Sequence, residues 1–182
     1  LVLLAETMEG YQNLLKLVTV SFTDGMHDRP RMDKELLGKY AKGLIALIPS
    51  FAGDVAQLIA AGDTDGASAA LAQYESIFGK GNVYLEVSHH PKVQGHSAKM
   101  EKIRALSKKA SIPTVAQHDV YYLTPDDAQA TAVLRRIGQG GQGFNEEEDF
   151  SFVSEAWIRE HFNAEEVEES GRKIDRLKRR EQ

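Results

Sequence analysis

Histidine and carboxylate side chains follow two β-rich segments of this 182-residue chain. His89 and His90 come directly after the first segment, which contains Glu86, and His118 and Asp119 come directly after the second. Because loops at the carboxyl ends of parallel strands meet at one edge of a sheet, we expect these groups to lie close together. Imidazole and carboxylate groups bind Zn, Mn or Fe, and such ions activate water and hold phosphate. The pattern therefore indicates a metallohydrolase face.

A second interpretation of these histidines stays open. Histidines in loops after strands are often solvated or cap a helix, and no short motif of fixed spacing links the residues named above. The chain contains no cysteine, which excludes disulfide scaffolds, zinc fingers, thiol catalysis and iron–sulfur clusters.

Two other segments could bind phosphate or nucleic acid. The glycine-rich run 138–143 follows an expected helix and lacks the lysine and the strand–turn–helix context of a phosphate loop, so a connector is the better interpretation. The stretch 172–180 holds six basic residues and one acid, but the acidic stretch 165–169 precedes it. A charged surface helix is therefore favoured over a nucleic-acid contact.

Helical patterns alternate with short β-branched runs, which favours an α/β fold. The apolar run 43–48 predicts a strand buried on both faces, and strands are also expected over 82–88 and 112–116. Helices and a short edge strand complete the expected elements. The helices cover 9–22, 33–40, 53–61, 63–78, 96–110 and 124–137, one follows Ser154, one starts at 164, and the edge strand covers 150–153.

Composition favours one soluble globular domain or a small pair of domains. The formal net charge is −5, with 42% hydrophobic and 27% charged residues. The longest apolar runs fall far short of the roughly 20 residues that a membrane span needs, which excludes a membrane span and a signal peptide. The mildly acidic balance disfavours binding to nucleic acid by bulk charge. We expect a cytoplasmic protein that does not contact a membrane.

Consecutive blocks of the chain occur in a recognisable order over about residues 1–160. They include Gly10–Leu14, Arg29–Leu37, Gly43–Leu47, Tyr84–Glu86, Ile112–Ala116, Asp126–Ala128 and Phe150–Trp157. In this order they resemble the PHP (polymerase and histidinol phosphatase) domain of the bacterial DNA polymerase III alpha subunit. The resemblance implies a distorted seven-stranded, TIM-like β/α barrel. It also implies a metal cluster at the carboxyl ends of the strands.

The resemblance assigns individual metal ligands. His90 matches the family's histidine after the Tyr-Leu-Glu strand, and Asp119 matches the aspartate of its Asp-Val-His-Tyr motif. The implied cofactor is a divalent metal, namely Zn, Mn or Mg. Tyr121 stands where that motif has a histidine, and Ser50 stands where the family often has a cysteine. Since a neutral hydroxyl replaces neither ligand well, the resemblance implies a degraded metal site.

The resemblance also implies how the chain is organised and what it does. Residues 1–143 correspond to the C-terminal portion of the barrel, and residues 144–182 correspond to an extension with helices toward the polymerase core. Because the chain starts at Leu1 and about three strands are visible, we expect a part of a larger chain. The family's paired histidines would lie before Leu1.

Two classes of function follow from the resemblance. The favoured one is a non-catalytic platform within a DNA-directed DNA polymerase used in DNA replication. The alternative is a metal-dependent phosphoesterase or 3′–5′ proofreading exonuclease, and a free-standing phosphatase is a third possibility. The implied partners are the rest of the alpha chain, DNA through the parent protein, and a proofreading exonuclease subunit.

Overall fold

A mixed sheet of four strands organises the chain. The computed structural model describes residues 1–138 and 148–178. The strands are β1 (Val2–Ala5), β2 (Leu44–Ile48), β3 (Val83–Ser88) and β4 (Thr114–Gln117), in the order β1-β2-β3-β4. β1 pairs antiparallel with β2, whereas β2, β3 and β4 are parallel. The α/β class is therefore as predicted, with an open sheet over the described residues.

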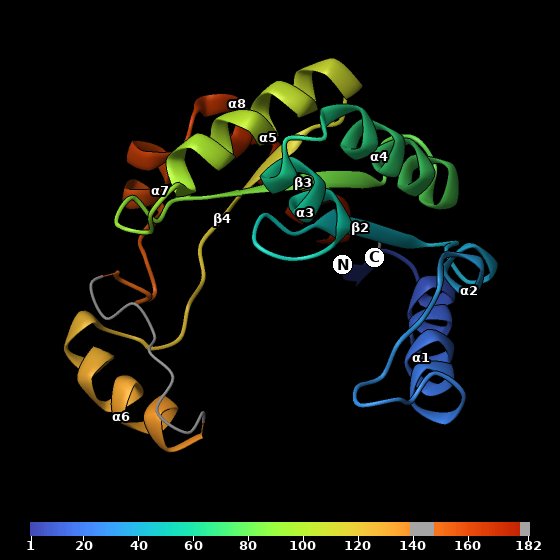
Figure 1. The fold of residues 1–182 in the computed structure, drawn as a ribbon, viewed down its shortest axis with the longest axis horizontal. Helices are drawn as coiled ribbons and strands as arrows, with labels where there is room; N and C mark the ends of the chain where they lie inside the picture. Colours follow the sequence, from blue (N-terminus) through green and yellow to red (C-terminus); the bar gives the residue numbers. More distant parts are fainter. Residues whose placement is uncertain (139–147, 179–182) are drawn as a thin grey trace.

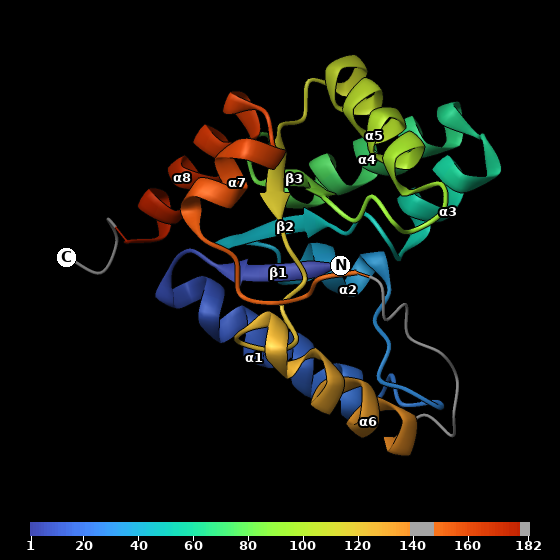
Figure 2. The same ribbon diagram turned by 90° about the vertical axis from the view of Figure 1, so that its left-hand side faces the viewer.

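Helices cover the sheet and extend beyond it. α3, α4 and α5 lie over one face, whereas α1 and α6 project away at opposite ends of the molecule (Figure 1). α7 and α8 lie beside β4 (Figure 2). The helices are α1 (Met8–Thr23), α2 (Lys34–Lys39), α3 (Asp54–Ala61), α4 (Thr64–Phe78), α5 (His96–Ala110), the 3₁₀ turn η1 (Pro125–Asp127), α6 (Ala128–Gly138), α7 (Glu155–His161) and α8 (Ala164–Lys178).

The start of α1 is held against the start of β2. Thr7 caps α1, because its hydroxyl accepts a hydrogen bond from the Gly10 amide at 3.0 Å. Gly43 has a φ of +76°, and a Cβ at Gly10 would overlap the Gly43 carbonyl. Two glycines thus allow a close backbone approach that a larger residue would prevent.

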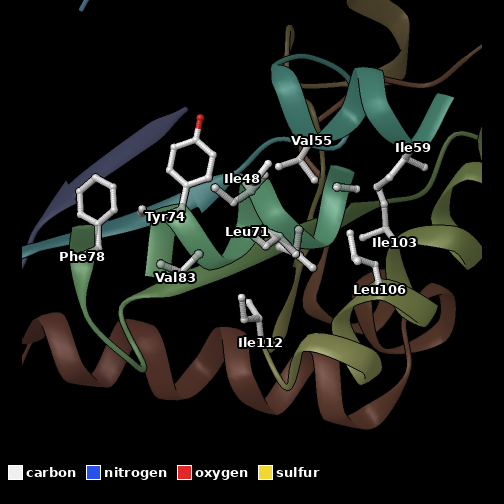
Figure 3. Packing of buried hydrophobic residues seen from close by; sticks show 14 of the residues in the cluster. Ile48, Val55, Ile59, Leu71, Tyr74, Phe78, Val83, Ile103, Leu106 and Ile112 are labelled. Atoms are coloured by element: carbon white, nitrogen blue, oxygen red, sulfur yellow. The ribbon is translucent and has the colours of Figure 1, made fainter. Parts of the chain in front are cut away.

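The main core lies between β2, β3 and the helices α3, α4 and α5. Leu44, Ala46 and Ile48 of β2 face this cluster, whereas Ile45 and Leu47 belong to a smaller cluster with Tyr84 and Val115. This alternation is the period-two pattern of a strand buried on both faces, as the apolar run 43–48 predicts. Leu71 of α4 packs among Ile48, Val55 and Ile103 at the centre (Figure 3).

α8 covers the outer edge of β4. The Ser170 hydroxyl accepts a hydrogen bond from the Ala116 amide at 3.0 Å, so a side chain satisfies a backbone group of this edge strand. Glu166, which is 1% exposed, pairs with Arg104 of α5 at 2.7 Å. These contacts fix α8 against both the sheet and α5.

One strand was missed by the sequence analysis, and one expected strand is wrong. β1 was not predicted, because a four-residue apolar run carries no clear alternation, and its antiparallel partner β2 is what orders it. Residues 150–153 form no strand. They make an isolated bridge, Ser151 to Tyr122, because the segment beside them has already left the sheet after β4.

Several expectations lie outside the described residues. They concern most of the glycine-rich run, the boundary placed between 143 and 144, and the basic residues beyond 178. In residues 1–138 and 148–178, no helix is both long and apolar enough to cross a membrane.

Replacement of Leu71 by alanine should destabilise the chain strongly. Leu71 is 0% exposed, so its truncation leaves a cavity that costs about 2–5 kcal/mol. Leu134→Ala on α6 is the matched control, because Leu134 is 70% exposed and its truncation should change stability by no more than about 0.5 kcal/mol. Urea unfolding of both variants measures the difference, and equal effects would contradict the described core.

Candidate functional site

The register of the two parallel strands β3 and β4 brings His90 and Asp119 together. Ser88 pairs with Gln117 at the last matched position of the two strands. His90 and Asp119 each lie two residues further along, so the parallel chains carry them to the same point beyond the sheet edge. The Nε2 atom of His90 lies 3.4 Å from Oδ2 of Asp119.

His90 is enclosed by aromatic rings and imidazoles. Its ring centroid lies 5.0 Å from that of Phe150, 5.4 Å from His96, 5.5 Å from His118 and 5.7 Å from Phe51. The side chain is 1% exposed, yet neither ring nitrogen has a hydrogen-bond partner among the described residues. Buried polar atoms in proteins are usually paired, so these two nitrogens, like both ring nitrogens of His118, are chemically open groups of the site.

A carboxylate lies on each side of the His90 ring. Asp119 faces Nε2, and Oε2 of Glu148 lies 3.8 Å from Nδ1. Sequence reasoning did not identify Glu148. It is one of four consecutive acidic residues, 146–149, and nothing in the sequence distinguishes the one whose side chain is buried.

Asp119 is held as a carboxylate. The neighbouring His90 ring keeps the pKa of Asp119 below its ordinary value, whereas partial burial acts in the opposite direction. Nε2 of Gln117 also donates a hydrogen bond to Oδ1 of Asp119 at 3.2 Å, which favours the charged form. Asp119 can therefore offer a negatively charged oxygen at neutral pH.

The remaining members of the predicted cluster are directed elsewhere. His89 faces α7, with its ring centroid 4.6 Å from His161 and 5.7 Å from Trp157. Glu86 is buried inside β3 opposite Val115, before the strand's carboxyl end. Of the residues that the sequence grouped together, the structure thus brings His90, His118 and Asp119 into one place.

The two exchanged positions differ in their surroundings. Ser50 is 1% exposed, and its hydroxyl lies 3.1 Å from that of Ser88. Tyr121 is 48% exposed, with its ring centroid 5.1 Å from that of Phe150. Ser50 therefore lies at the end of β2 near the site, whereas Tyr121 lies on its exposed rim.

The separation of His90 and Asp119 can be compared with that of two ligands of a divalent cation. Ligands of a tetrahedral ion with bonds of about 2.0–2.1 Å lie about 3.3 Å apart, close to the 3.4 Å between Nε2 and Oδ2. The unpartnered Nε2 is the atom that such a bond would use. Within 1–138 and 148–178, however, no three His, Cys, Asp or Glu side chains are grouped so that they could hold a metal.

Comparison with known proteins relates the first part of this fold to a known domain family. Residues 1–90 match the family model described as the PHP domain. This part includes β1, β2, β3 and His90. By this match, residues 1–90 form a PHP-domain region.

Its relatives include DNA polymerase III alpha subunits. The chain is 33% identical over 146 residues to the subunit of Borreliella burgdorferi, and the match covers 80% of this chain and 13% of that subunit. It is 31% identical over 170 residues to the subunit of Saccharopolyspora erythraea, and this match covers 90% of the chain and 14% of that subunit. The Bacillus subtilis subunit is 35% identical over 140 residues, and the match covers 77% of this chain and 12% of that subunit. The chain thus spans about an eighth of the curated relatives it matches, and the homologous regions are small parts of larger polymerase chains.

The site should make folding stability depend on pH. Burial lowers the pKa of His118 below its ordinary value, and the neighbouring His90 acts in the same direction. The unfolded chain then binds more protons as the pH falls below about 6.5, so the free energy of unfolding should fall in that range.

Replacement of His118 by glutamine should make the pH dependence of stability weaker. Glutamine does not titrate, so the variant lacks one buried imidazole whose pKa is lowered in the folded chain. His27→Gln is the control, since His27 is exposed. Unfolding can be followed through Trp157, the single tryptophan of the chain, which packs 4.8 Å from the His118 ring. A pH profile equally steep in wild type and His118→Gln between pH 7 and about 5 would contradict the expectation.

Proposed function

We propose that this chain is the PHP region of a DNA polymerase III alpha chain that serves DNA replication, and that it acts there as a structural platform. In this proposal residues 1–143 form the C-terminal portion of a seven-stranded β/α barrel, and residues 144–182 lead toward the polymerase core. The open four-stranded sheet is consistent with a partial barrel. His90 and Asp119 are then the remaining ligands of a degraded metal site.

The observation that carries the platform role is the exposed apolar face of α1. Five large apolar side chains recur along this helix at three- and four-residue steps, and each is 45–71% exposed. Contiguous apolar surface of this kind is typical of a contact site. The five residues are Met8, Tyr11, Leu15, Val18 and Phe22.

The partners of this platform follow from the relatives. Those relatives are DNA polymerase III alpha subunits several times longer than the matched region, so the first partner is the rest of such a chain. DNA would be contacted through the parent protein. A proofreading exonuclease subunit is the further partner that the resemblance implies.

A metal-dependent phosphoesterase or 3′–5′ exonuclease is the second candidate. It is favoured by the separation of 3.4 Å between Nε2 of His90 and Oδ2 of Asp119. These two atoms would hold Zn, Mn or Mg, and the bound ion would lower the pKa of a water and stabilise charge on a phosphate. Asp119 would supply the charged oxygen, and the rings around His90 would exclude bulk water from that side.

Degradation of single-stranded DNA separates the two functions. The platform role predicts that the chain, supplied in turn with Zn²⁺, Mn²⁺ and Mg²⁺, releases no more nucleotide than a control without protein. The reason is that two ligands do not hold an ion in a catalytic geometry. Metal content is measured in parallel on the same samples.

Asp119→Asn is the decisive variant, and Asp126→Asn is its matched control because Asp126 is an exposed aspartate outside the site. Metal-dependent degradation that disappears in Asp119→Asn but persists in Asp126→Asn would overturn the platform role. It would establish the enzyme in its place.

A further inference from the structure

A hollow of about 240 Å³ lies between α3, α4 and α5, the three helices that cover one face of the sheet (Figure 1). Its floor is apolar, because Ile59, Ala67 and Leu106 belong to the main core and are no more than 6% exposed. Figure 3 shows Ile59 and Leu106 approaching from α3 and α5. The rim of the hollow is exposed and includes Lys102 and Lys109 of α5.

Small side chains keep this hollow open. Lys102, Ala105 and Lys109 follow one another on α5 at three- and four-residue steps, so they form one stripe beside the stripe that faces the core. Ala105, in the middle of this stripe, is exposed, and Ala67 of α4 lines the same hollow. Because an alanine side chain ends at Cβ, these two residues leave room that longer side chains would fill.

The rim of the hollow is positively charged in an otherwise acidic chain. α5 carries five lysine and arginine residues and one glutamate, whereas the net charge of the chain is −5. Within 1–138 and 148–178, the Lys102 ammonium has no hydrogen-bond or ion-pair partner. Lys109 pairs with Asp65 at 3.1 Å, but the Asp65 side chain is 93% exposed, and ion pairs of this kind contribute little. Both lysines are therefore available to the carboxylates of a partner.

We infer that this hollow docks an acidic, amphipathic helix of a partner protein: an apolar side chain enters the hollow over Ala105, and carboxylates on either side pair with Lys102 and Lys109. Charge complementarity selects this occupant, since an apolar floor between two cations suits an apolar side chain between two acids. The phosphates of a nucleic acid would pair with the lysines alone, and the apolar floor would add nothing to that contact. The docking site depends neither on a metal nor on the exposed face of α1.

The rise of α5 sets the spacing of the partner's acids. Lys102 and Lys109 are seven residues apart, which corresponds to about 10 Å along a helix that rises about 1.5 Å per residue. A partner helix that lies along α5 would therefore carry acids at positions i and i+7. Its apolar residue would stand between them, at i+3 or i+4, because these positions lie on the same face of a helix.

Binding of a synthetic helix to the whole chain tests this inference. The probe is a fluorescein-labelled, alanine-rich peptide of about 20 residues, with two glutamates seven positions apart and a leucine between them. The control probe carries glutamine in place of both glutamates. Fluorescence anisotropy at about 0.15 M salt gives the two affinities. We expect the chain to bind the glutamate probe about 10-fold more tightly than the glutamine probe, because only the former pairs with the lysines.

Lys102→Glu and Ala105→Leu are the sharpest variants. The first replaces attraction by repulsion, the second fills the hollow, and both positions are exposed. Each should weaken binding of the glutamate probe about 10-fold. Lys108→Glu is the matched control, because it makes the same charge change at an exposed position of the same helix that does not line the hollow. It should change the affinity by no more than about 2-fold at this salt concentration.

The possible results decide between occupants. The inference is overturned if wild type binds the glutamate probe no more tightly than the glutamine probe, or if Lys102→Glu binds it as tightly as wild type. Single-stranded DNA that binds wild type and is weakened equally by Lys102→Glu and Lys108→Glu would assign the lysines to nucleic acid instead. A dimer in sedimentation that Ala105→Leu dissociates would assign the hollow to a second copy of the chain. If Ala105→Leu unfolds, Lys102→Gln, which removes the charge without repulsion, gives the second comparison.

Discussion

The parallel pairing of β3 with β4 is the constraint on which the site depends. It fixes the register at which both strands leave the sheet, and the residues two positions beyond the Ser88–Gln117 pair are His90 and Asp119. A shift of that register by one residue would direct the alternate side chains toward each other. The buried β3 strand, held between α4 and α5 and the smaller cluster, makes such a shift costly.

The elements around the sheet stabilise this edge in different ways. α5 begins at His96, whose Nε2 lies 2.9 Å from the Ser88 carbonyl, so the helix start is tied to the end of β3. Phe51, in the loop after β2, stacks on the His96 ring at 5.0 Å. α7 contacts His89 through Trp157. His90 itself is buried among rings from several of these elements, including Phe51 and His96.

The sequence was sufficient for the α/β class and for the pairing of His90 with Asp119. The apolar run of β2 and the β-branched runs of β3 and β4 carry clear patterns, and parallel strands bring their carboxyl ends to one edge. β1 and Glu148 could not be predicted in this way. β1 depends on its pairing with β2, and Glu148 depends on how the chain returns beside Tyr121 and Tyr122, which are long-range contacts without a local signal.

We propose centrally that this chain is a PHP region whose degraded metal site retains two ligand atoms, Nε2 of His90 and Oδ2 of Asp119. Crystals of the whole chain grown with Zn²⁺ and measured at the zinc absorption edge test it most directly. We expect one anomalous peak within about 2.0–2.2 Å of both atoms. A peak bonded to Nδ1 of His90, or no peak at this edge of the sheet while zinc is bound elsewhere, would contradict it.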